Sequence, residues 1–486
     1  MPTRAEPRTG AVVRDPGSFR DPAGYVLHHG DALYRSLDGS AFEQLATFLA
    51  TPAYQRLTAS GDLLPVTVAE ASEGEELARL EQRDDRYYVR QRRLPIISYP
   101  YEWSPRMLHG AAQCTLRIQA ALIEAGLTLK DASAYNIQFE LTERGPTPIF
   151  IDITSVEAMG PRALWMAHHQ FMRHFAFPLI LYRQFGHDYR GDFLGDLEGV
   201  SADSVYRLAG PLRRWFPPYL FAVTVPHLLR NMESRHPLAV DGPAVQIGRR
   251  DAEGDRYILT RMVRRLHRLI ERLEPAAQTS QWTAYEVENS YPAAAAARKA
   301  EFVASACGTI KPARLINLGC NLGRFDLIAA EHGAEVLALD LDLASVDAVY
   351  ERARSRHARI LPLRIDIAAP SPAIGWKNRE RRSFLDRACR FDCVMALAVV
   401  HHLLVTNRIP LEQIVDSIAR LSSRHVILEL VDPTDSMFRQ LARGNQDLYT
   451  ELTIEAQERE FAQRFRIVER CALEGIPRVL YVLEKR

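Results

Sequence analysis

Short apolar blocks alternate with amphipathic stretches along the second half of the chain. Apolar blocks of this length are typical of strands that are buried on both faces. Because neighbouring parallel strands need a crossover helix, the alternation predicts an α/β domain. The expected strands cover residues 314–318, 334–339, 360–366, 391–397 and 424–430, and residues 465–473 and 479–483 are expected to complete the sheet as a hairpin.

The first half of the chain has a different pattern, in which short strands are mixed with helices. Residues 24–27 and 32–35 read as a hairpin, and residues 106–125 have the apolar spacing of an amphipathic helix that stops at Gly126. These features predict a separate α+β domain. The expected division of the chain is a mobile tail at 1–24, the α+β domain at 25–235, a bridging helical segment at 236–275 and the α/β domain at 276–486.

A glycine-bearing turn follows the first expected parallel strand. The turn covers residues 319–323, and a helix is expected directly after it. Glycines let the backbone pass close to a ligand, and the N-terminus of the helix offers unpaired N–H groups. Asp340 ends the next strand, where a carboxylate suits a ribose diol. This arrangement predicts a nucleotide-like ligand at the turn.

Residues 315–323 resemble motif I of the class I S-adenosylmethionine (SAM) methyltransferases, and Asp340 stands where that family has its ribose-binding acid. Two departures are Asn317, which replaces the usual acid, and Asn321, which replaces the middle glycine. The resemblance implies a Rossmann-like sheet with an antiparallel last strand and SAM as the cofactor. The residues it implies at the cofactor are Asn317, Gly319, Cys320, Asn321, Gly323, Asp340, Leu341, Asp366, Ile367, Ala398, Tyr285 and Lys299.

Two adjacent histidines, His401 and His402, follow the fourth expected strand of this sheet. In the methyltransferase pattern this segment borders the methyl group. Imidazole titrates near neutral pH, so either histidine could remove a proton from an acceptor hydroxyl. The alternative is that one histidine packs while the other binds the backbone. Residues 368–390 lie at the carboxyl end of the sheet, and we expect them to shape the acceptor pocket.

A second pattern lies in the first half, where Asp131 and Asn136 precede an expected hairpin that ends at Asp152. It resembles the catalytic loops of protein kinases and aminoglycoside phosphotransferases. In those families the first Asp orients the attacking hydroxyl, and the other two residues hold Mg²⁺ on the nucleotide. Lys130 departs from the pattern, as does the Ile153-Thr154 pair. We expect a kinase-like shape without phosphotransfer; the alternative is that Asp131 and Asn136 brace a loop.

Composition limits the classes of partner. The 486 residues carry a net charge of +1, which gives no reason to expect nucleic acid. The six cysteines form no C-x-x-C pair, so we expect a reducing compartment and no metal site. The N-terminus lacks an apolar signal region, and the most apolar stretch, residues 215–229, is short and contains three prolines. These observations predict a cytoplasmic protein without a membrane span.

Strings in both halves resemble the NoeA-type nodulation proteins, two-part SAM-dependent methyltransferases. These strings are residues 98–103, 129–139, 149–157, 361–376, 395–403 and 426–435. The resemblance implies transfer of a methyl group to an oxygen or nitrogen of a small-molecule or glycan acceptor. The alternatives are a nucleotide-binding kinase-like protein with a degenerate methyltransferase domain and a non-catalytic binding protein. The sequence leaves the acceptor and the oligomeric state open.

Overall fold

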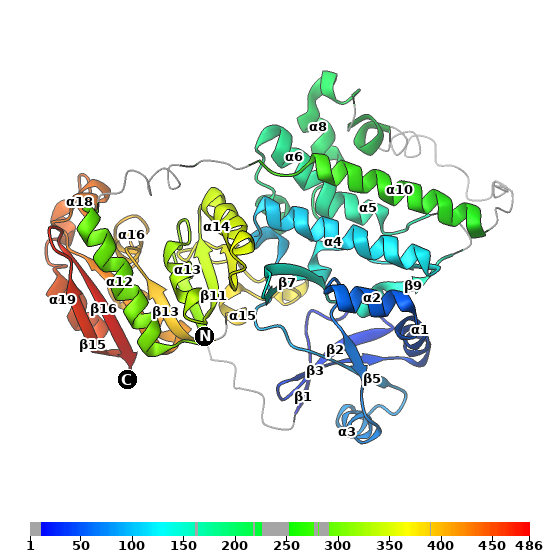
Figure 1. Cartoon of the computed structure of the whole chain (residues 1–486), viewed down its shortest axis with the longest axis horizontal. Coiled ribbons are helices and arrows are strands. Elements are labelled where there is room, and N and C mark those ends of the chain that lie inside the picture. The colour runs from blue at the N-terminus through cyan, green and yellow to red at the C-terminus, as the bar shows by residue number, and fades with distance from the viewer. Residues whose placement is uncertain are drawn as a thin grey trace.

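The computed structural model describes residues 11–160, 164–216, 219–225, 252–276, 280, 291–388 and 390–486. Two bodies lie side by side, with the N-terminal half and the C-terminal half each built around its own sheet (Figure 1). None of the helices in the described ranges combines the length and the apolar character that a bilayer crossing requires.

Seven strands form one sheet in the C-terminal half, in the order β12-β11-β10-β13-β14-β16-β15. Strands β10 to β14 are parallel, and β16 runs antiparallel between β14 and β15. The predicted Rossmann-like class with an antiparallel last strand is therefore confirmed. The bounds are β10 Arg314–Leu318, β11 Glu335–Asp340, β12 Ile360–Arg364, β13 Phe391–Ala396, β14 Ser422–Val431, β15 Phe465–Ala472 and β16 Arg478–Lys485.

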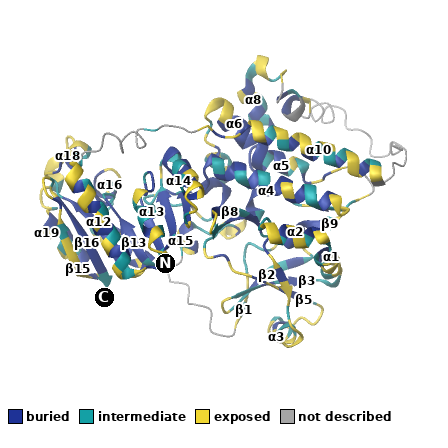
Figure 2. Ribbon diagram, in the orientation of Figure 1, coloured by how far each residue is buried: buried dark blue, intermediate teal, exposed yellow. Residues whose placement is uncertain are grey.

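Helices cover both faces of this sheet, which explains why its strands read as continuous apolar runs. Leu315 and Ile316 are neighbours on β10, yet they belong to separate core clusters because successive side chains point to opposite faces. The inner strands β11 and β13 are buried along most of their length, as Figure 2 shows, whereas the edge strand β15 is largely exposed. The helices are α12 Ala293–Ile310, α13 Arg324–Glu331, α14 Leu343–Ser355, α15 Phe384–Arg387, α16 Val400–Val405, α17 Leu411–Leu421, α18 Ser436–Leu441 and α19 Ile454–Ala462.

The N-terminal half begins with an antiparallel sheet in the order β1-β2-β3-β5-β4, and a buried helix, α4, follows it. Two small pairs, β6 with β9 and β7 with β8, flank the segment that carries Asp131 and Asn136. The bounds are β1 Val12–Arg14, β2 Gly24–His29, β3 Ala32–Leu37, β4 Val66–Val68, β5 Tyr87–Gln91, β6 Leu127–Leu129, β7 Ile137–Thr142, β8 Gly145–Phe150 and β9 Val156–Ala158.

A helical layer completes the N-terminal half. Its longest member, α10, packs along α4, and His109 Nε2 lies 3.0 Å from the carbonyl of Ile270. The described part of the expected bridge is therefore attached to the N-terminal half. The helices are α1 Gly39–Leu49, α2 Pro52–Ser60, α3 Ala71–Glu81, α4 Pro105–Glu124, α5 His168–Phe171, α6 Phe177–Phe185, α7 Arg190–Gly195, α8 Ala202–Arg213 and α10 Ala252–Arg272.

The excursion between β12 and β13 joins the two halves. Arg387 forms an ion pair with Glu102, and both side chains are buried. The backbone N–H of Arg382 donates to the hydroxyl of Tyr99 at 3.2 Å. Because a buried guanidinium needs a carboxylate partner, the excursion is held against the N-terminal half.

Candidate active site

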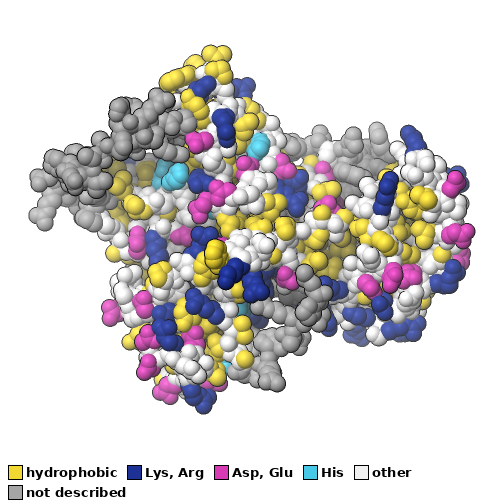
Figure 3. Space-filling model, turned by 180° about the vertical axis from the view of Figure 1, so that it is seen from behind, with side chains coloured by type: hydrophobic (Ala, Val, Ile, Leu, Met, Phe, Trp, Pro, Cys, Tyr) yellow, Lys and Arg dark blue, Asp and Glu magenta, His cyan; other side chains and the backbone are white. Residues whose placement is uncertain are grey.

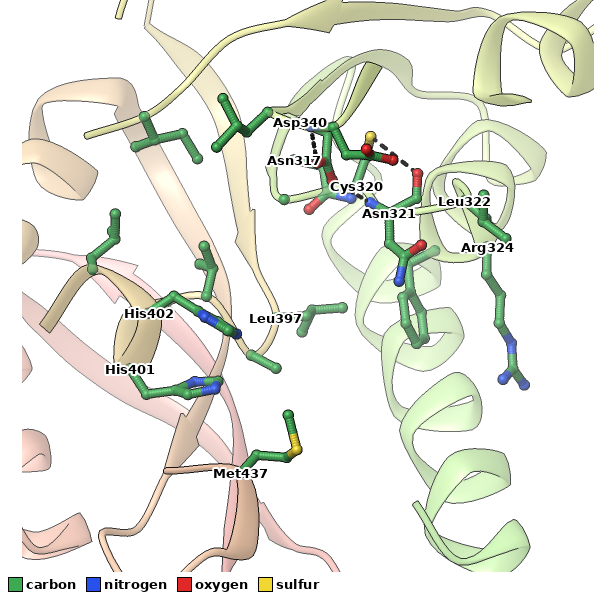
Figure 4. Close-up of a pocket in the computed structure, with 18 of the residues that line it drawn as sticks. Asn317, Cys320, Asn321, Leu322, Arg324, Asp340, Leu397, His401, His402 and Met437 are labelled. Atoms are coloured by element: carbon green, nitrogen blue, oxygen red, sulfur yellow. Dashed lines mark hydrogen bonds between the residues drawn. The ribbon is translucent and has the colours of Figure 1, made fainter. Parts of the chain in front are cut away.

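A cavity of about 390 Å³ opens where β10, β11, β12 and β13 end at the carboxyl edge of the sheet (Figure 4). The predicted residues that line it are Asn317, Gly319, Cys320, Asn321, Asp340, Leu341, Asp366, Ile367, Ala398, Lys299, His401 and His402. Gly323 does not line the cavity, and Tyr285 lies outside the described residues. Ligands of open α/β sheets bind at this edge.

The expectation that residues 368–390 shape an acceptor pocket is wrong. None of the described residues in this excursion lines the cavity. The excursion turns away because its buried Arg387 pairs with Glu102 of the N-terminal half.

The glycine turn brings the backbone to the cavity through left-handed conformations. Gly319 has a φ of +85° and Asn321 a φ of +48°. Asn is one of the few residues that tolerate this region, which accounts for Asn321 in place of a glycine. Gly323 has a φ of +76°, and a Cβ there would lie 3.0 Å from Val349 of α14. Gly323 therefore permits close packing of α14 against the turn.

A carboxylate lies beneath Asn317, although the strand itself carries no acid. The Asn317 Nδ2 group donates to both carboxyl oxygens of Asp326 at 3.0 Å, and both side chains are buried. Burial raises the pKa of Asp326 to about 7, while the hydrogen bond from Asn317 opposes the rise. Asn317 lines the cavity, and its buried Oδ1 has no hydrogen-bond partner among the described groups.

Asp340 is held by the turn and still has capacity to accept hydrogen bonds. Its Oδ2 accepts from the N–H of Asn321 at 2.8 Å, and its Oδ1 accepts from the N–H of Asp342 at 2.9 Å. Burial raises the pKa of Asp340, and these backbone hydrogen bonds oppose the rise. Each carboxylate oxygen has a second lone pair, which suits a diol in the cavity.

The two histidines lie on the first turn of α16, and both rings point into the cavity (Figure 4). Their ring centroids are 4.3 Å apart, and the His401 ring also stacks on Phe438 at 6.3 Å. Burial lowers the pKa of both, and the charge of Arg478 lowers each further. Both imidazoles are therefore neutral near pH 7. His401 is buried, whereas His402 is half-buried.

No protein-family model matches the chain. Nodulation protein NoeA of Rhizobium meliloti (strain 1021) is 34% identical over 485 residues, which cover 99% of this chain and 97% of NoeA. The chain belongs to the NoeA family. Its C-terminal half has the fold that the resemblance to class I SAM-dependent methyltransferases implies, with the expected sheet and glycine turn.

Solved structures that resemble this NoeA-family chain include two methyltransferases. The N-methyltransferase NodS from Bradyrhizobium japonicum WM9 is 14% identical, covers 39% of this chain and 96% of its own, and has a TM-score of 0.30. The bifunctional kinase-methyltransferase WbdD is 17% identical, covers 45% of each chain and has a TM-score of 0.30.

A buried ionic network lies against the cavity at Lys299 and Arg478, which both line it. Lys299 Nζ lies 2.6 Å from Glu429 Oε2, and the Tyr291 hydroxyl donates to Glu429 Oε1 at 2.6 Å. Arg478 Nε lies 2.8 Å from Asp435 Oδ2. Burial lowers the pKa of Lys299, although Glu429 opposes the change. The two cations and the two carboxylates cancel, so this wall of the site carries no net formal charge.

In the N-terminal half of this NoeA-family chain, Asp152 is engaged by protein groups. Arg35 Nη1 lies 2.8 Å from its Oδ1, and the hydroxyls of Thr154 and Ser155 donate to its two oxygens at 2.7 and 2.5 Å. Burial raises the pKa of Asp152, but Arg35 and the two hydroxyls outweigh it and the net shift is downward. The carboxylate therefore already has its charge neutralised by Arg35.

The other two residues of the kinase-like pattern have loop-bracing contacts. Asp131 Oδ1 accepts from the N–H of Ser133 at 2.8 Å, and Asn136 Nδ2 lies 3.5 Å from the Ser155 hydroxyl. Throughout the described ranges, no group of three His, Cys, Asp or Glu side chains is placed to hold a metal ion. These contacts fit the bracing alternative better than a Mg²⁺–nucleotide site.

Sequence reasoning missed several residues of the cavity and its support. These are Asp326, Glu429, Asp435, Met437 and Arg478. Asp326 lies three residues beyond the turn, one helical turn from Gly323, and this spacing is a signal that could have identified it. Arg478 opens the last strand, and only the antiparallel placement of β16 beside β14 brings it to the site.

Proposed function

We propose that this NoeA-family protein transfers the methyl group of SAM to a hydroxyl oxygen of a small-molecule or glycan acceptor. The observation that carries the proposal is one cavity that joins the glycine turn and Asp340 to the neutral pair His401 and His402. When bound, SAM supplies an electrophilic methyl group on a sulfonium centre. The chain itself supplies orientation and a proton acceptor.

The cavity lining fits the chemical groups of SAM. Asp340 has spare lone pairs for the ribose diol, and Leu341 and Ile367 offer apolar walls for the adenine ring. Asn317 and Asn321 each carry a buried Oδ1 without a hydrogen-bond partner within the described part of the chain. A buried acceptor without a partner is costly, so each oxygen is a candidate acceptor for the ammonium group of SAM.

The charges at the other end of the cavity favour a neutral acceptor. Lys299 and Arg478 are balanced by Glu429 and Asp435, so this end attracts neither an ammonium nor a carboxylate group. A neutral imidazole is a proton acceptor suited to a hydroxyl. We assign this role to His402, because it is half-buried and lines the cavity, whereas His401 is buried against Phe438.

The test is calorimetric titration of the purified chain with SAM and with S-adenosylhomocysteine. We expect both to bind, and we expect Asp340→Ala to weaken binding by about 1.5–3 kcal/mol through loss of charge-assisted hydrogen bonds. The control is Asp447→Ala, which removes an exposed acid outside the cavity and should leave the affinity unchanged. A folded Asp340→Ala variant with full affinity would contradict the assignment.

Transfer of labelled methyl from SAM to neutral sugars and to amino sugars then tests the acceptor class. Product from the neutral hydroxyl compounds supports the proposal, and product from the amines alone overturns the hydroxyl assignment.

Titration with ATP–Mg²⁺ tests the kinase-like alternative. Heat that disappears in Asp152→Ala would favour that alternative.

A further inference from the structure

Large apolar side chains are exposed at the end of α8, far from the cofactor cavity. Leu208 is 45% exposed, Leu212 78%, Trp215 54% and Phe216 65%. Soluble proteins rarely gather so many exposed large apolar groups in one place without a partner. The helix kinks at Gly210, which has a φ of +68°, and the kink carries the last three of these residues away from the helix axis.

The surface is a projecting tip and not a groove. The end of α8 stands out from the body of the molecule in Figure 1, and Figure 3 shows hydrophobic side chains gathered there with Lys and Arg side chains beside them. The neighbouring end of α6 extends the tip, because the guanidinium of Arg213 lies 5.5 Å from the centroid of the Phe185 ring.

The charged side chains of the tip are all positive. Arg207 and Arg213 are exposed and Arg214 is half-buried, and residues 204–216 contain neither Asp nor Glu. The nearest acids before this run are Asp203, which is half-buried at the start of α8, and the exposed Glu198 and Asp196. Asp196 is paired with Arg173 at 2.7 Å. Exposed Trp, Phe and Leu side chains among arginines are the composition of a surface that enters the interface of an anionic bilayer.

We propose that this tip, residues Leu208, Leu212, Trp215 and Phe216 with Arg207, Arg213 and Arg214, is a docking surface for a membrane that contains anionic lipids. The apolar side chains enter the boundary between headgroups and acyl chains, and the arginines face the lipid phosphates. A projecting tip suits a deformable lipid surface, whereas a protein partner would need a complementary hollow.

The experiment is sedimentation of the full chain with vesicles of phosphatidylcholine alone and of phosphatidylcholine mixed with phosphatidylglycerol. We expect partition onto the anionic vesicles that weakens with added salt. The double substitution Leu212→Glu and Phe216→Glu should lower the partition constant by at least about tenfold, because it replaces buried apolar contacts by charges that the lipid repels. The matched control is Leu448→Glu, which changes a leucine that is 72% exposed elsewhere.

A second measurement locates the contact. Trp215→Phe should keep vesicle binding but lose part of the vesicle-induced blue shift of tryptophan fluorescence, since Phe retains the apolar character. Absence of partition for the wild type, or equal partition for the double variant, would overturn the proposal. So would self-association that the double variant abolishes while no vesicles bind, because the tip would then be an interface with a second copy of the chain. Circular dichroism shows that each variant is folded.

Discussion

The pair Asn317 and Asp326 explains how the site keeps an acid near the glycine turn when the strand has none. The amide nitrogen of Asn317 donates to both carboxyl oxygens of Asp326, and Asn317 itself lines the cavity. Because burial raises the pKa of Asp326 to about 7, the charge of this carboxyl group in the folded chain changes near neutral pH. Stability should therefore depend on pH through this group.

Asp326→Asn tests this dependence. The folded-state pKa of Asp326 is raised from 3.8 to about 7, so its contribution is fully present below 3.8 and is lost as pH rises through 7. We expect the wild type to lose up to about 4 kcal/mol relative to Asp326→Asn over this range. Urea denaturation of both proteins at roughly pH 4 and roughly pH 8 measures most of this difference. Parallel pH curves would show that Asp326 is ionised throughout.

The proposed base gives the second prediction at this scale. His402→Ala should slow turnover by about 10²–10⁴-fold and leave the affinity for S-adenosylhomocysteine unchanged. Because the pKa of His402 is lowered from 6.5, the wild-type rate should stay high down to pH 6.5 and fall only below it, as the imidazole gains a proton. His401→Phe, which keeps the stacking on Phe438, is the control and should cost less activity. Full activity in His402→Ala would remove this residue from the mechanism.

At the scale of elements, an ion pair connects β3 to the end of β8 across the N-terminal half. Arg35 binds the Asp152 carboxylate and also donates to the carbonyl of Ile151 at 3.1 Å. Its guanidinium lies where the kinase-like pattern implies a metal-bound nucleotide. In the kinase-like pattern a bound metal ion supplies the positive charge next to this carboxylate. Here the guanidinium of Arg35 supplies that charge.

Arg35→Met should destabilise the chain by about 1–3 kcal/mol, because it leaves the half-buried Asp152 carboxylate without its charged partner. The control is Arg92→Met, which breaks the pair with Glu140, in which the arginine is 49% exposed, and should cost less than about 1 kcal/mol. The denaturant midpoint reports stability, and binding of S-adenosylhomocysteine should be unchanged in both. Equal denaturant midpoints for the two variants would show that the Arg35–Asp152 pair stabilises the chain no more than the exposed Arg92–Glu140 pair does.

At the scale of the whole molecule, ionic contacts join the two halves. On the C-terminal side, these contacts come from helix α14 and from the excursion between β12 and β13. Arg387 pairs with Glu102, and Arg106 Nε lies 2.8 Å from Asp347 Oδ2. Asp347 lies on α14, which begins directly after Asp342 of the cavity lining. The N-terminal half therefore supports the helix that begins shortly after Asp340.

Arg387→Met should lower the free energy of unfolding by about 3–5 kcal/mol, since it leaves the buried Glu102 carboxylate between the halves without its partner. We expect calorimetry to show one unfolding transition for the wild type and two for the variant, because the halves lose their coupling. Arg466→Met is the control, since the Arg466 side chain is 64% exposed on the edge strand β15 and its partner Glu484 is half-buried. A single transition in Arg387→Met would show that other contacts suffice for the coupling.

The sequence by itself determined the architecture of the C-terminal half and the position of the cofactor turn. Buried parallel strands read as apolar runs, and a glycine turn before a helix is a local pattern, so neither depends on distant residues. The hairpin before Asp152 and the long helix 106–125 were predicted for the same reason, and the structure has them as β7 with β8 and as α4.

The tertiary structure alone decided which polar side chains meet. Glu429, Arg478 and Lys299 come from β14, β16 and α12, and no local pattern links them. Residues 368–390 were expected to shape the acceptor pocket. That expectation failed because Arg387 in this segment pairs with Glu102, which lies in the other half of the sequence. Local periodicity specifies elements, but ion pairs between distant elements depend on how the elements pack.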